Sequence, residues 1–311
     1  MRGMRPTDLN RVDPSPQPFP TRGEGDAVHP APSSPAPSSP VTWAGITLDR
    51  PRVMGVLNVT PDSFSDGGAY SDSDIAIQAG LAMARAGADI IDVGGESTRP
   101  GASPTSPADE QARVLPVVRT LVAAGLRISI DTRNASTMEA ALGAGAVIVN
   151  DVSALTHDPA AACVVAARGC PVVLMHMRGE PATMNTHAIY ADVAGEVIEE
   201  LAARVAAAER AGIAREAIAI DPGIGFAKLA PQSLELLRRL PELAVLGRPI
   251  LVGVSRKSFI GRIGGESDPQ KRMPGSLAAA LFAVSQGVAI LRVHDVAATV
   301  QALRVWQTLK A

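Results

Sequence analysis

The sequence is poor in aromatic residues, which make up 3% of its 311 positions, so its core has to be built from aliphatic side chains and alanine. It holds only two cysteines, Cys163 and Cys170. Two cysteines cannot close a zinc site by themselves, and we interpret them as reduced thiols, as is typical of a cytoplasmic protein. The formal charge of −2 gives no electrostatic reason to expect nucleic acid or an anionic membrane as a partner. No apolar run approaches the roughly 18 residues of a membrane span.

The first 40 residues differ in composition from the rest of the chain. They contain ten of the 25 prolines and end in HPAPSSPAPSSP. Such a segment cannot bury enough apolar surface to offset the entropy lost on folding, so we expect residues 1–40 to form a disordered low-complexity tail. It lacks the apolar stretch of a secretory signal. It is either a genuine tail or an extension produced by a start codon placed too far upstream. We expect one folded domain over 41–311.

Eight short apolar runs follow one another along this domain, each with a Val/Ile/Leu-rich centre and polar residues at its end. They lie at 53–58, 89–96, 127–133, 147–151, 171–177, 217–223, 249–257 and 289–295. Continuous apolar runs are typical of strands buried on both faces, and the Ala-rich segments between them have helical spacing. Eight such units predict an α/β fold, a closed (β/α)₈ barrel, in which reactive groups lie at the C-terminal ends of the strands.

The connecting segments predict the helices and loops around this barrel. We expect helices over 72–87, 107–124, 135–144, 158–169, 191–211, 231–240, 275–287 and 296–309. The long loops 60–71 and 97–106 are rich in Gly, Pro and Ser, and long loops at the catalytic face usually cover a site. The segment 261–274 is a third candidate for a mobile loop. Residues 41–49 are expected to form a hairpin arm that closes the opposite end of the barrel.

Carboxylates and an amide stand at several predicted strand ends. Asp92, Asp131 and Asp221 each end an apolar run, and Asn150 does the same. A single Asp after a strand is usually a helix cap or a turn former. Three of them with an amide on one barrel face indicate a ligand edge rich in N–H donors. Asn58, at the end of the first run, is a candidate ligand for Mg²⁺, which prefers oxygen donors and keeps several waters.

Basic residues end the last two runs. Arg256 and Lys257 end the seventh, and Arg292 and His294 end the eighth. Barrels of this type often bind phosphate at these strands, and an ammonium, a guanidinium and an imidazole together suit a phosphate or diphosphate. For Arg256 the main alternative is an ordinary solvent-facing position. His176, in LMHM, is interpreted as a core or supporting residue rather than a reactive one.

The sequence lacks the motifs of several common enzyme classes. It has no HExxH metal-binding pattern, no GxSxG nucleophile elbow and no GxGxxG dinucleotide loop. Covalent catalysis therefore has no evident nucleophile. We expect instead a substitution that depends on positioning the reactants and on stabilising a leaving diphosphate electrostatically.

Taken together, a series of sequence blocks resembles the dihydropteroate synthase family. The blocks are LNVTPDSFSDGG (57–68), DVGGESTRPGA (92–102), SIDT (129–132), VNDVSAL (149–155), LMHMRGEPATM (174–184), DPGIGFAK (221–228), SRKSFIG (255–261) and GSLAAA with LRVHDV (275–296). The resemblance implies a (β/α)₈ transferase that uses Mg²⁺ and condenses 6-hydroxymethyl-7,8-dihydropterin diphosphate with 4-aminobenzoate. The products would be 7,8-dihydropteroate and diphosphate, in tetrahydrofolate biosynthesis.

The resemblance also implies roles for individual residues. The pterin is expected on Asp92, Asp131, Asn150, Met175, Asp221 and Lys257. The aminobenzoate is expected between Thr98, Arg99, Pro100, Phe226 and Ser258, under a loop that carries Asp62, Ser63 and Phe64. The diphosphate is expected on Asn58, Arg292 and His294, with Mg²⁺ between Asn58 and the phosphates. The catalytic step would depend on Asp131, Lys257, Arg292 and His294.

Two other functions stay open at this level. One is a catalytically silent paralogue that binds pterin without turnover, and the other is a relative that binds reduced folates for methyl transfer to a corrinoid protein. The blocks LNVTPDSFSDGG, SRKSFIG and RVHDV favour an active synthase over the first, and the STRP loop together with the RVHD anion site favours it over the second. By resemblance we expect a homodimer, in which the helix over 275–287 either forms the interface or belongs to the core.

Overall fold

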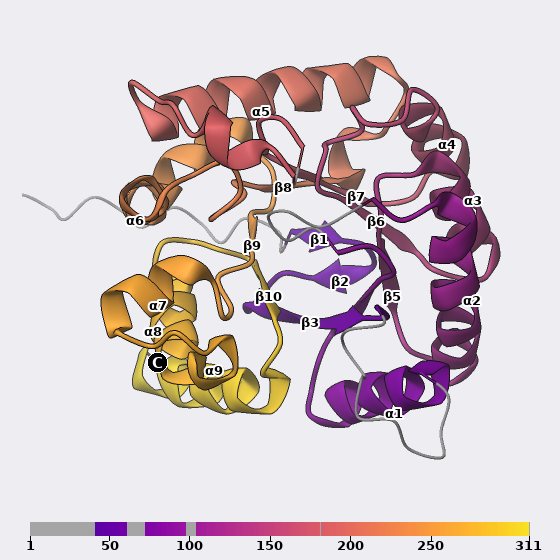
Figure 1. Ribbon diagram of the computed structural model, residues 1–311, viewed down its shortest axis with the longest axis horizontal. Helices are drawn as coiled ribbons and strands as arrows, with labels where there is room; N and C mark the ends of the chain where they lie inside the picture. The colour runs from indigo at the N-terminus through magenta and orange to yellow at the C-terminus, as the bar shows by residue number, and fades with distance from the viewer. Residues whose placement is uncertain (1–40, 61–71, 98–103, 181, 311) are drawn as a thin grey trace, which may run out of the picture. The chain divides into compact units, whose positions relative to one another are not determined.

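The computed structural model describes residues 41–60, 72–97, 104–180 and 182–310. The predicted tail lies outside the described residues, and so do six of the predicted site residues: Asp62, Ser63, Phe64, Thr98, Arg99 and Pro100. In the described residues, strands and helices alternate, and the helices surround the strands (Figure 1).

The strands fall into a short hairpin and a barrel. The hairpin strands are β1 (Thr42–Trp43) and β2 (Ile46–Thr47). The barrel strands are β3 (Arg52–Asn58), β4 (Ile90–Gly94), β5 (Ile128–Asp131), β6 (Ile148–Asp151), β7 (Val172–Met175), β8 (Ile218–Asp221), β9 (Leu251–Val252) and β10 (Ile290–Val293). Each predicted apolar run coincides with one barrel strand, although β3 begins one residue before its run.

The helices follow the predicted order with one addition. The α-helices are α1 (Asp72–Arg85), α2 (Pro107–Ala123), α3 (Ala135–Gly143), α4 (Ala161–Arg168), α5 (Val193–Arg210), α6 (Ala230–Arg238), α7 (Ser258–Gly264), α8 (Met273–Ser285) and α9 (Val296–Lys310). Short 3₁₀ helices are η2 (Met184–His187), η3 (Arg215–Ala217), η4 (Leu240–Leu246) and η5 (Pro269–Lys271). The addition is α7, which no predicted helix covers.

The barrel strands form one parallel sheet in the order β8-β7-β6-β5-β4-β3-β10-β9. Its two outer strands meet through a parallel bridge between Ile220 and Ile250, where the amide of Ile220 donates to the carbonyl of Pro249 at 3.0 Å. The sheet is thereby nearly closed, which confirms the predicted (β/α)₈ barrel.

Side chains on the strands alternate between the barrel interior and the surrounding helices, and this decides which strand-end residues face the site. On β4, Ile90 belongs to an interior cluster while Ile91 packs against the helices. Asp92, two residues after Ile90, therefore faces inward. The same spacing from Ile290 turns Arg292 inward on β10. The interior cluster near the strand starts includes Met54, Ile90, Ile148, Val173, Ala219, Leu251 and Ile290.

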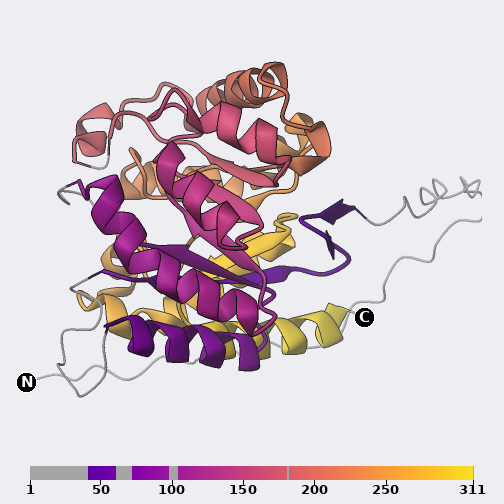
Figure 2. The same ribbon diagram turned by 90° about the vertical axis from the view of Figure 1, so that its right-hand side faces the viewer.

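The hairpin closes the end of the barrel where the strands begin. Trp43 is only 1% exposed and packs in the interior cluster, and its indole Nε1 donates to the carbonyl of Ala217 at 2.9 Å. Figure 2 shows the hairpin at one end of the barrel. This confirms the predicted cap, and it leaves the C-terminal ends of the strands as the open face.

The prediction of a loop over 261–274 is wrong in part, because most of this segment is helical. It contains the end of α7, the turn η5 and the start of α8. A Cβ atom at Gly275 would lie 2.4 Å from Cγ2 of Ile260, so this glycine lets α8 approach α7 closely.

The described helices and the two cysteines bear on a membrane span and on the redox state of the thiols. No helix in the described ranges is long and apolar enough to cross a membrane. Cys163 is exposed and Cys170 is buried, and both are free thiols. Burial raises the pKa of the Cys170 thiol to about 11, which keeps it protonated.

Candidate active site

A cavity of about 890 Å³ opens at the C-terminal ends of the barrel strands. Its floor and walls come from strand ends and from the segments that follow them. Among the residues that line it are Asn58, Glu96, Asp131, Met184, Phe226, Lys257, Ser258, Arg292 and His294. Thr60 and Ser97, the described residues at the start of the two long loops, also line it. The cavity is large enough for a small-molecule ligand.

An acid–guanidinium cluster lies on the inner side of four strands, β4, β5, β6 and β10. Nε of Arg292 donates to Oδ2 of Asp92 at 2.6 Å, and its Nη2 donates to Oδ2 of Asp131 at 2.5 Å. Asn150 donates from Nδ2 to the same Oδ2 of Asp92 at 3.0 Å. The chain brings these residues together from positions up to 200 apart. The cluster therefore exists only because β10 pairs with β3 and the sheet curves into a barrel.

Two carboxylates share one guanidinium in this cluster, and this shifts the protonation of Asp131. Burial raises the pKa of Asp131 to about 7, against the lowering effect of Arg292, and the charge of Asp92 adds to the increase. Asp92 is fully buried, and its Oδ1 accepts no hydrogen bond from the described residues. A buried carboxylate oxygen without a donor is costly, so the cluster is suited to a ligand that brings N–H groups.

A third acid and a lysine lie next to this cluster, Asp221 at the end of β8 and Lys257 in the segment that follows β9. Oδ1 of Asp221 accepts a hydrogen bond from the amide of Gly223 at 2.7 Å, and burial raises the pKa of Asp221 while the charge of Lys257 opposes the increase. The ammonium of Lys257 donates to the carbonyl of Ile224 and lies 4.5 Å from the ring centroid of Phe226. Burial lowers the pKa of Lys257 to about 8.

The remaining predicted site residues lie around these clusters. Met175, at the end of β7, is 4% exposed and two residues after the inward-facing Val173. Asn58 ends β3, and Ser258 begins α7; both line the cavity. The backbone amide of His294 donates to Oγ of Ser255 at 3.2 Å, and its Nδ1 lies 3.0 Å from the same oxygen.

Most of the described predicted site residues line the cavity, and Asp92, Asn150 and Asp221 lie next to it through their contacts with the acid–guanidinium cluster. Two further basic residues can also be placed. Arg256 pairs with Asp295 through two hydrogen bonds of 3.0 and 2.5 Å, so its guanidinium is engaged at the rim. His176 is buried and its ring contacts Glu200 of α5, so the interpretation as a supporting residue is confirmed. Its position one residue after Met175 places it on the opposite face of the strand.

Sequence reasoning missed two buried charged residues next to the site. Glu96 accepts from Nε and Nη2 of Arg133 at 2.9 and 3.0 Å and from the amide of Thr105 at 3.2 Å, so it joins both ends of the second long loop. Lys228 is 4% exposed and bonds to the segment after β8. Both stand inside blocks that the sequence analysis recognised, DVGGESTRPGA and DPGIGFAK. Their position in those blocks was the available signal.

The chain is similar to known proteins over most of its length. A family model described as pterin binding enzyme matches residues 54–294. The dihydropteroate synthase of Neisseria meningitidis serogroup C is 48% identical over 267 residues, which are 85% of this chain and 94% of that protein. The dihydropteroate synthase of Escherichia coli K12 is 46% identical over 261 residues, 84% of this chain and 92% of that protein.

Solved structures give the same result. The Xanthomonas albilineans dihydropteroate synthase with 4-aminobenzoic acid is 50% identical, with a TM-score of 0.82, over 86% of this chain and 97% of that one. The dihydropteroate synthase of the same organism in complex with 7,8-dihydropteroate is 47% identical, with a TM-score of 0.79, over 86% of this chain and 96% of that one.

Proposed function

Because this chain belongs to the dihydropteroate synthases of the pterin-binding enzyme family, we propose that its barrel cavity binds a pterin diphosphate and 4-aminobenzoate and joins them. Its activity is that of a dihydropteroate synthase, a transferase of folate biosynthesis. The proposal concerns which residues of this chain bind each part of the two substrates and how they assist the reaction.

The pterin binds at the barrel floor, between the acid–guanidinium cluster and Asp221. The observation that carries this assignment is the fully buried Asp92, whose Oδ1 accepts no hydrogen bond from the described residues. The amino and ring N–H groups of a pterin are donors of the kind that this oxygen, Asp131, Asn150 and Asp221 would accept. Met175 lies against the pterin ring, and Lys257 donates to an acceptor of the ring. With a pKa of about 8, Lys257 is largely protonated at pH 7.

The diphosphate lies above the pterin, next to Arg292, His294 and Asn58. Arg292 uses Nε and Nη2 for the two carboxylates, which leaves the Nη1 donors for a phosphate oxygen. Arg292 therefore contacts both the carboxylates at the floor of the pocket and the leaving diphosphate. As the C–O bond between the pterin methylene and the diphosphate breaks, the electron pair leaves with the diphosphate, and these donors stabilise the charge.

We assign Mg²⁺ a place beside Asn58. The described residues include no group of three or more His, Cys, Asp or Glu side chains that could hold a metal ion. One amide oxygen at the rim fits an ion that keeps several waters and takes its other ligands from substrate phosphates. When bound, Mg²⁺ would neutralise the negative charge that develops on the leaving diphosphate.

The second substrate approaches from the cavity side. Phe226 and Ser258 form the described part of the aminobenzoate pocket, and Thr98, Arg99 and Pro100 are proposed to complete it. The loop with Asp62, Ser63 and Phe64 is proposed to cover it and exclude water, which would otherwise capture the pterin methylene cation. The aryl amine then attacks the methylene next to Asp131 and loses a proton.

The decisive experiment is an assay of product formation with purified protein. It supplies the pterin diphosphate and Mg²⁺ with and without 4-aminobenzoate and measures both diphosphate release and dihydropteroate. Dihydropteroate formed only with the aryl amine supports the proposal. Pterin binding without product would indicate a silent paralogue, and no binding of either substrate would contradict the assignment of the cavity.

We also propose that the chain forms a homodimer through α8 and α9. These neighbouring helices expose large apolar side chains: Met273 at 38%, Phe282 at 42%, Val305 at 57% and Leu309 at 82%. A second copy of the chain would cover this surface. Light scattering coupled to size-exclusion chromatography tests the proposal, and Phe282→Asp should shift a dimer toward the monomer. A monomeric wild-type protein would contradict it.

A further inference from the structure

A buried lysine lies directly behind the turn that joins the pterin side of the cavity to the aminobenzoate side. This turn, Gly223–Phe226, follows Asp221 at the end of β8, and the amide of Phe226 donates to the carbonyl of Gly223 at 3.0 Å. Lys228 is 4% exposed. Its Nζ donates to the carbonyl of Gly223 at 3.2 Å and to that of Phe226 at 3.0 Å. Both ends of the turn are thus bound to one ammonium.

The third partner of this ammonium is the imidazole of His176, whose Nδ1 lies 2.8 Å from Nζ. Burial lowers the pKa of Lys228 to about 7. In its protonated form the side chain has three N–H donors and no acceptor, so Nδ1 has to accept and the ring proton belongs on Nε2. Nε2 lies 3.0 Å from Oε2 of Glu200, which can accept that proton. Burial and the nearby ammonium lower the pKa of His176 to about 3, which keeps the ring neutral. Among the described residues, every N–H group of Lys228 therefore has an acceptor.

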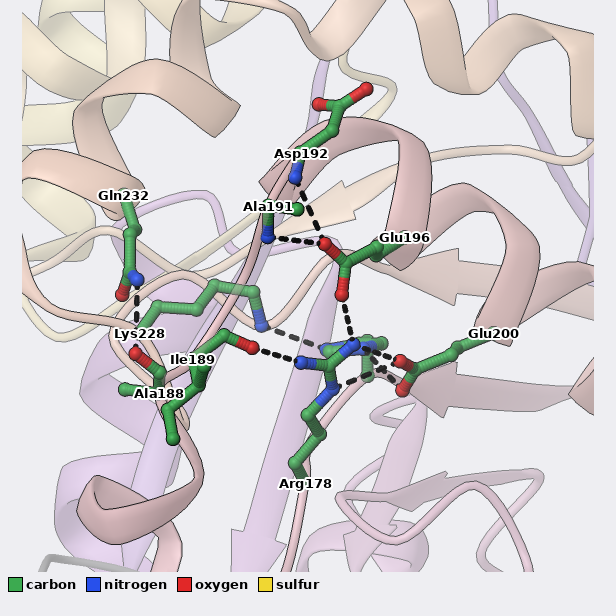
Figure 3. Close-up of polar contacts among 10 residues, drawn as sticks. Arg178, Ala188, Ile189, Ala191, Asp192, Glu196, Glu200, Lys228 and Gln232 are labelled. Carbon is green, nitrogen blue, oxygen red and sulfur yellow. Dashed lines mark hydrogen bonds and ion pairs between the residues drawn. The ribbon is translucent and has the colours of Figure 1, made fainter.

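The imidazole is itself held by a network on α5. Nε of Arg178 donates to Oε1 of Glu200 at 2.9 Å, and Nη2 donates to Oε2 of Glu196 at 2.7 Å. The guanidinium of Arg178 also lies 4.0 Å from the ring centroid of Tyr190. Figure 3 shows Arg178 between the two glutamates, with Lys228 on the other side of the cluster. A buried lysine fixed by such a network is a rigid support rather than a surface charge.

The backbone of this turn is closely packed against the segment after β7, which restricts its conformation. Gly223 has a φ of +66°, and a Cβ atom there would lie 2.0 Å from the carbonyl oxygen of His176. His176 also donates its backbone amide to the carbonyl of Asp221 at 2.9 Å. On the cavity side, Lys257 donates to the carbonyl of Ile224. The turn is thus held between Lys228 behind it and Lys257 in front of it.

We propose that Lys228 is a positioning residue of the synthase reaction. From behind, it holds the turn Gly223–Phe226 and so sets where Asp221 and Lys257 meet the pterin and where Phe226 meets the aminobenzoate. It touches no substrate itself. This inference rests on the proposed function, because it concerns the same cavity.

The first test removes the ammonium with Lys228→Met and compares it with Lys310→Met, a matched change at the exposed end of α9. We expect Lys228→Met to lower kcat/KM for the pterin diphosphate by about 10²-fold, the effect of a misplaced reacting geometry. A lower kcat and a higher KM should both contribute. Lys310→Met should keep the wild-type values.

A pH profile separates positioning from a merely structural role. Charged or titratable groups face Lys228 from β8, from the segment after β9, from α5 and from the segment after β7: Asp221, Lys257, Glu200, His176, Arg178 and Tyr190. Burial raises the pKa of Asp221, and the charge of Lys228 is among those that oppose this increase. Removal of this charge should therefore raise that pKa and move the acid limb of kcat/KM to higher pH. Loss of activity that follows loss of folded protein, with the acid limb unmoved, would overturn the inference.

A second pair of variants decides the matter if Lys228→Met does not fold. His176→Asn keeps an oxygen acceptor near the Nδ1 position, whereas His176→Leu has none. We expect the Leu variant to lose at least about tenfold more kcat/KM than the Asn variant, the effect of one lost hydrogen bond. Equal values for the two, or a folded Lys228→Met with wild-type kinetics, would overturn the inference. A wild-type protein that forms no dihydropteroate would overturn the proposed function itself, before any variant is compared.

Discussion

Burial of Asp131 makes its ionised form costly in the folded protein, so replacing this carboxylate, for which we propose a catalytic role, should make the protein more stable while it abolishes turnover. Asp131 is 8% exposed and shares Arg292 with the fully buried Asp92. Burial is the main reason why its pKa is raised from 3.8 to about 7. The charge of Arg292 opposes this increase, and the charge of Asp92 adds to it. Asn has the shape and neutrality of the protonated acid, so Asp131→Asn removes the cost of ionisation.

The sign and size follow from proton linkage. Because the folded protein holds this proton more tightly than the unfolded chain does, the wild type loses stability as the pH rises from 3.8 to about 7. At about 1.4 kcal/mol per pKa unit, the loss is between about 1 and 2 kcal/mol at pH 5 and about 4 kcal/mol at pH 8. The difference in the free energy of unfolding between Asp131→Asn and the wild type should therefore increase by about 2–3 kcal/mol from pH 5 to pH 8. For a domain of this size that corresponds to roughly 5–10 °C in Tm.

The assay is urea or thermal unfolding of the ligand-free protein at pH 5 and pH 8. Asp49→Asn, which removes a carboxylate from a side chain that is 62% exposed, controls for the change in net charge. The dihydropteroate assay on the same samples should show that Asp131→Asn loses at least about 10²-fold in kcat. A variant that is no more stable than the wild type at pH 8, with no difference between the two pH values, would refute the reasoning.

Three further predictions concern the basic side of the site, the cap of the barrel and the tail. The value of kcat/KM should fall as the pH rises above about 8, because the ammonium of Lys257 then loses its proton. Lys257→Met should be about 10²-fold less active and should not show this decrease at high pH. A decrease that persists in the variant would mean that another group causes it. Trp43→Ala should lower the free energy of unfolding, measured with urea, by about 3–5 kcal/mol, with kcat nearly unchanged at a temperature where it stays folded; a large loss of kcat would mean that the cap shapes the site. Removal of residues 1–40 should leave Tm and kcat/KM at wild-type values, because the composition of this segment offers no core; a lower Tm would show that the segment packs on the domain.

The sequence was sufficient for the order of the barrel strands and for much of the site. Strand-end position identified Asp92, Asp131, Asn150 and Asp221, because the reactive ends of parallel strands meet on one face. The sequence of residues 41–49 also predicted the hairpin that closes the barrel. The sequence analysis did not predict α7, which is a short helix whose packing against α8 depends on the close approach of Ile260 to Gly275.

What the sequence by itself determined is the local pattern: eight buried runs, and the polar groups that end them. Which of these groups work together was decided by the tertiary structure. Closure of the sheet places β10 beside β3 and so brings Arg292 to Asp131, which lies 161 residues earlier. The alternation of strand side chains turns Met175 into the barrel and His176 out of it, where Lys228 reaches it from behind the β8 turn. These contacts, and the low polarity that shifts their pKa values, arise only when distant segments are buried together.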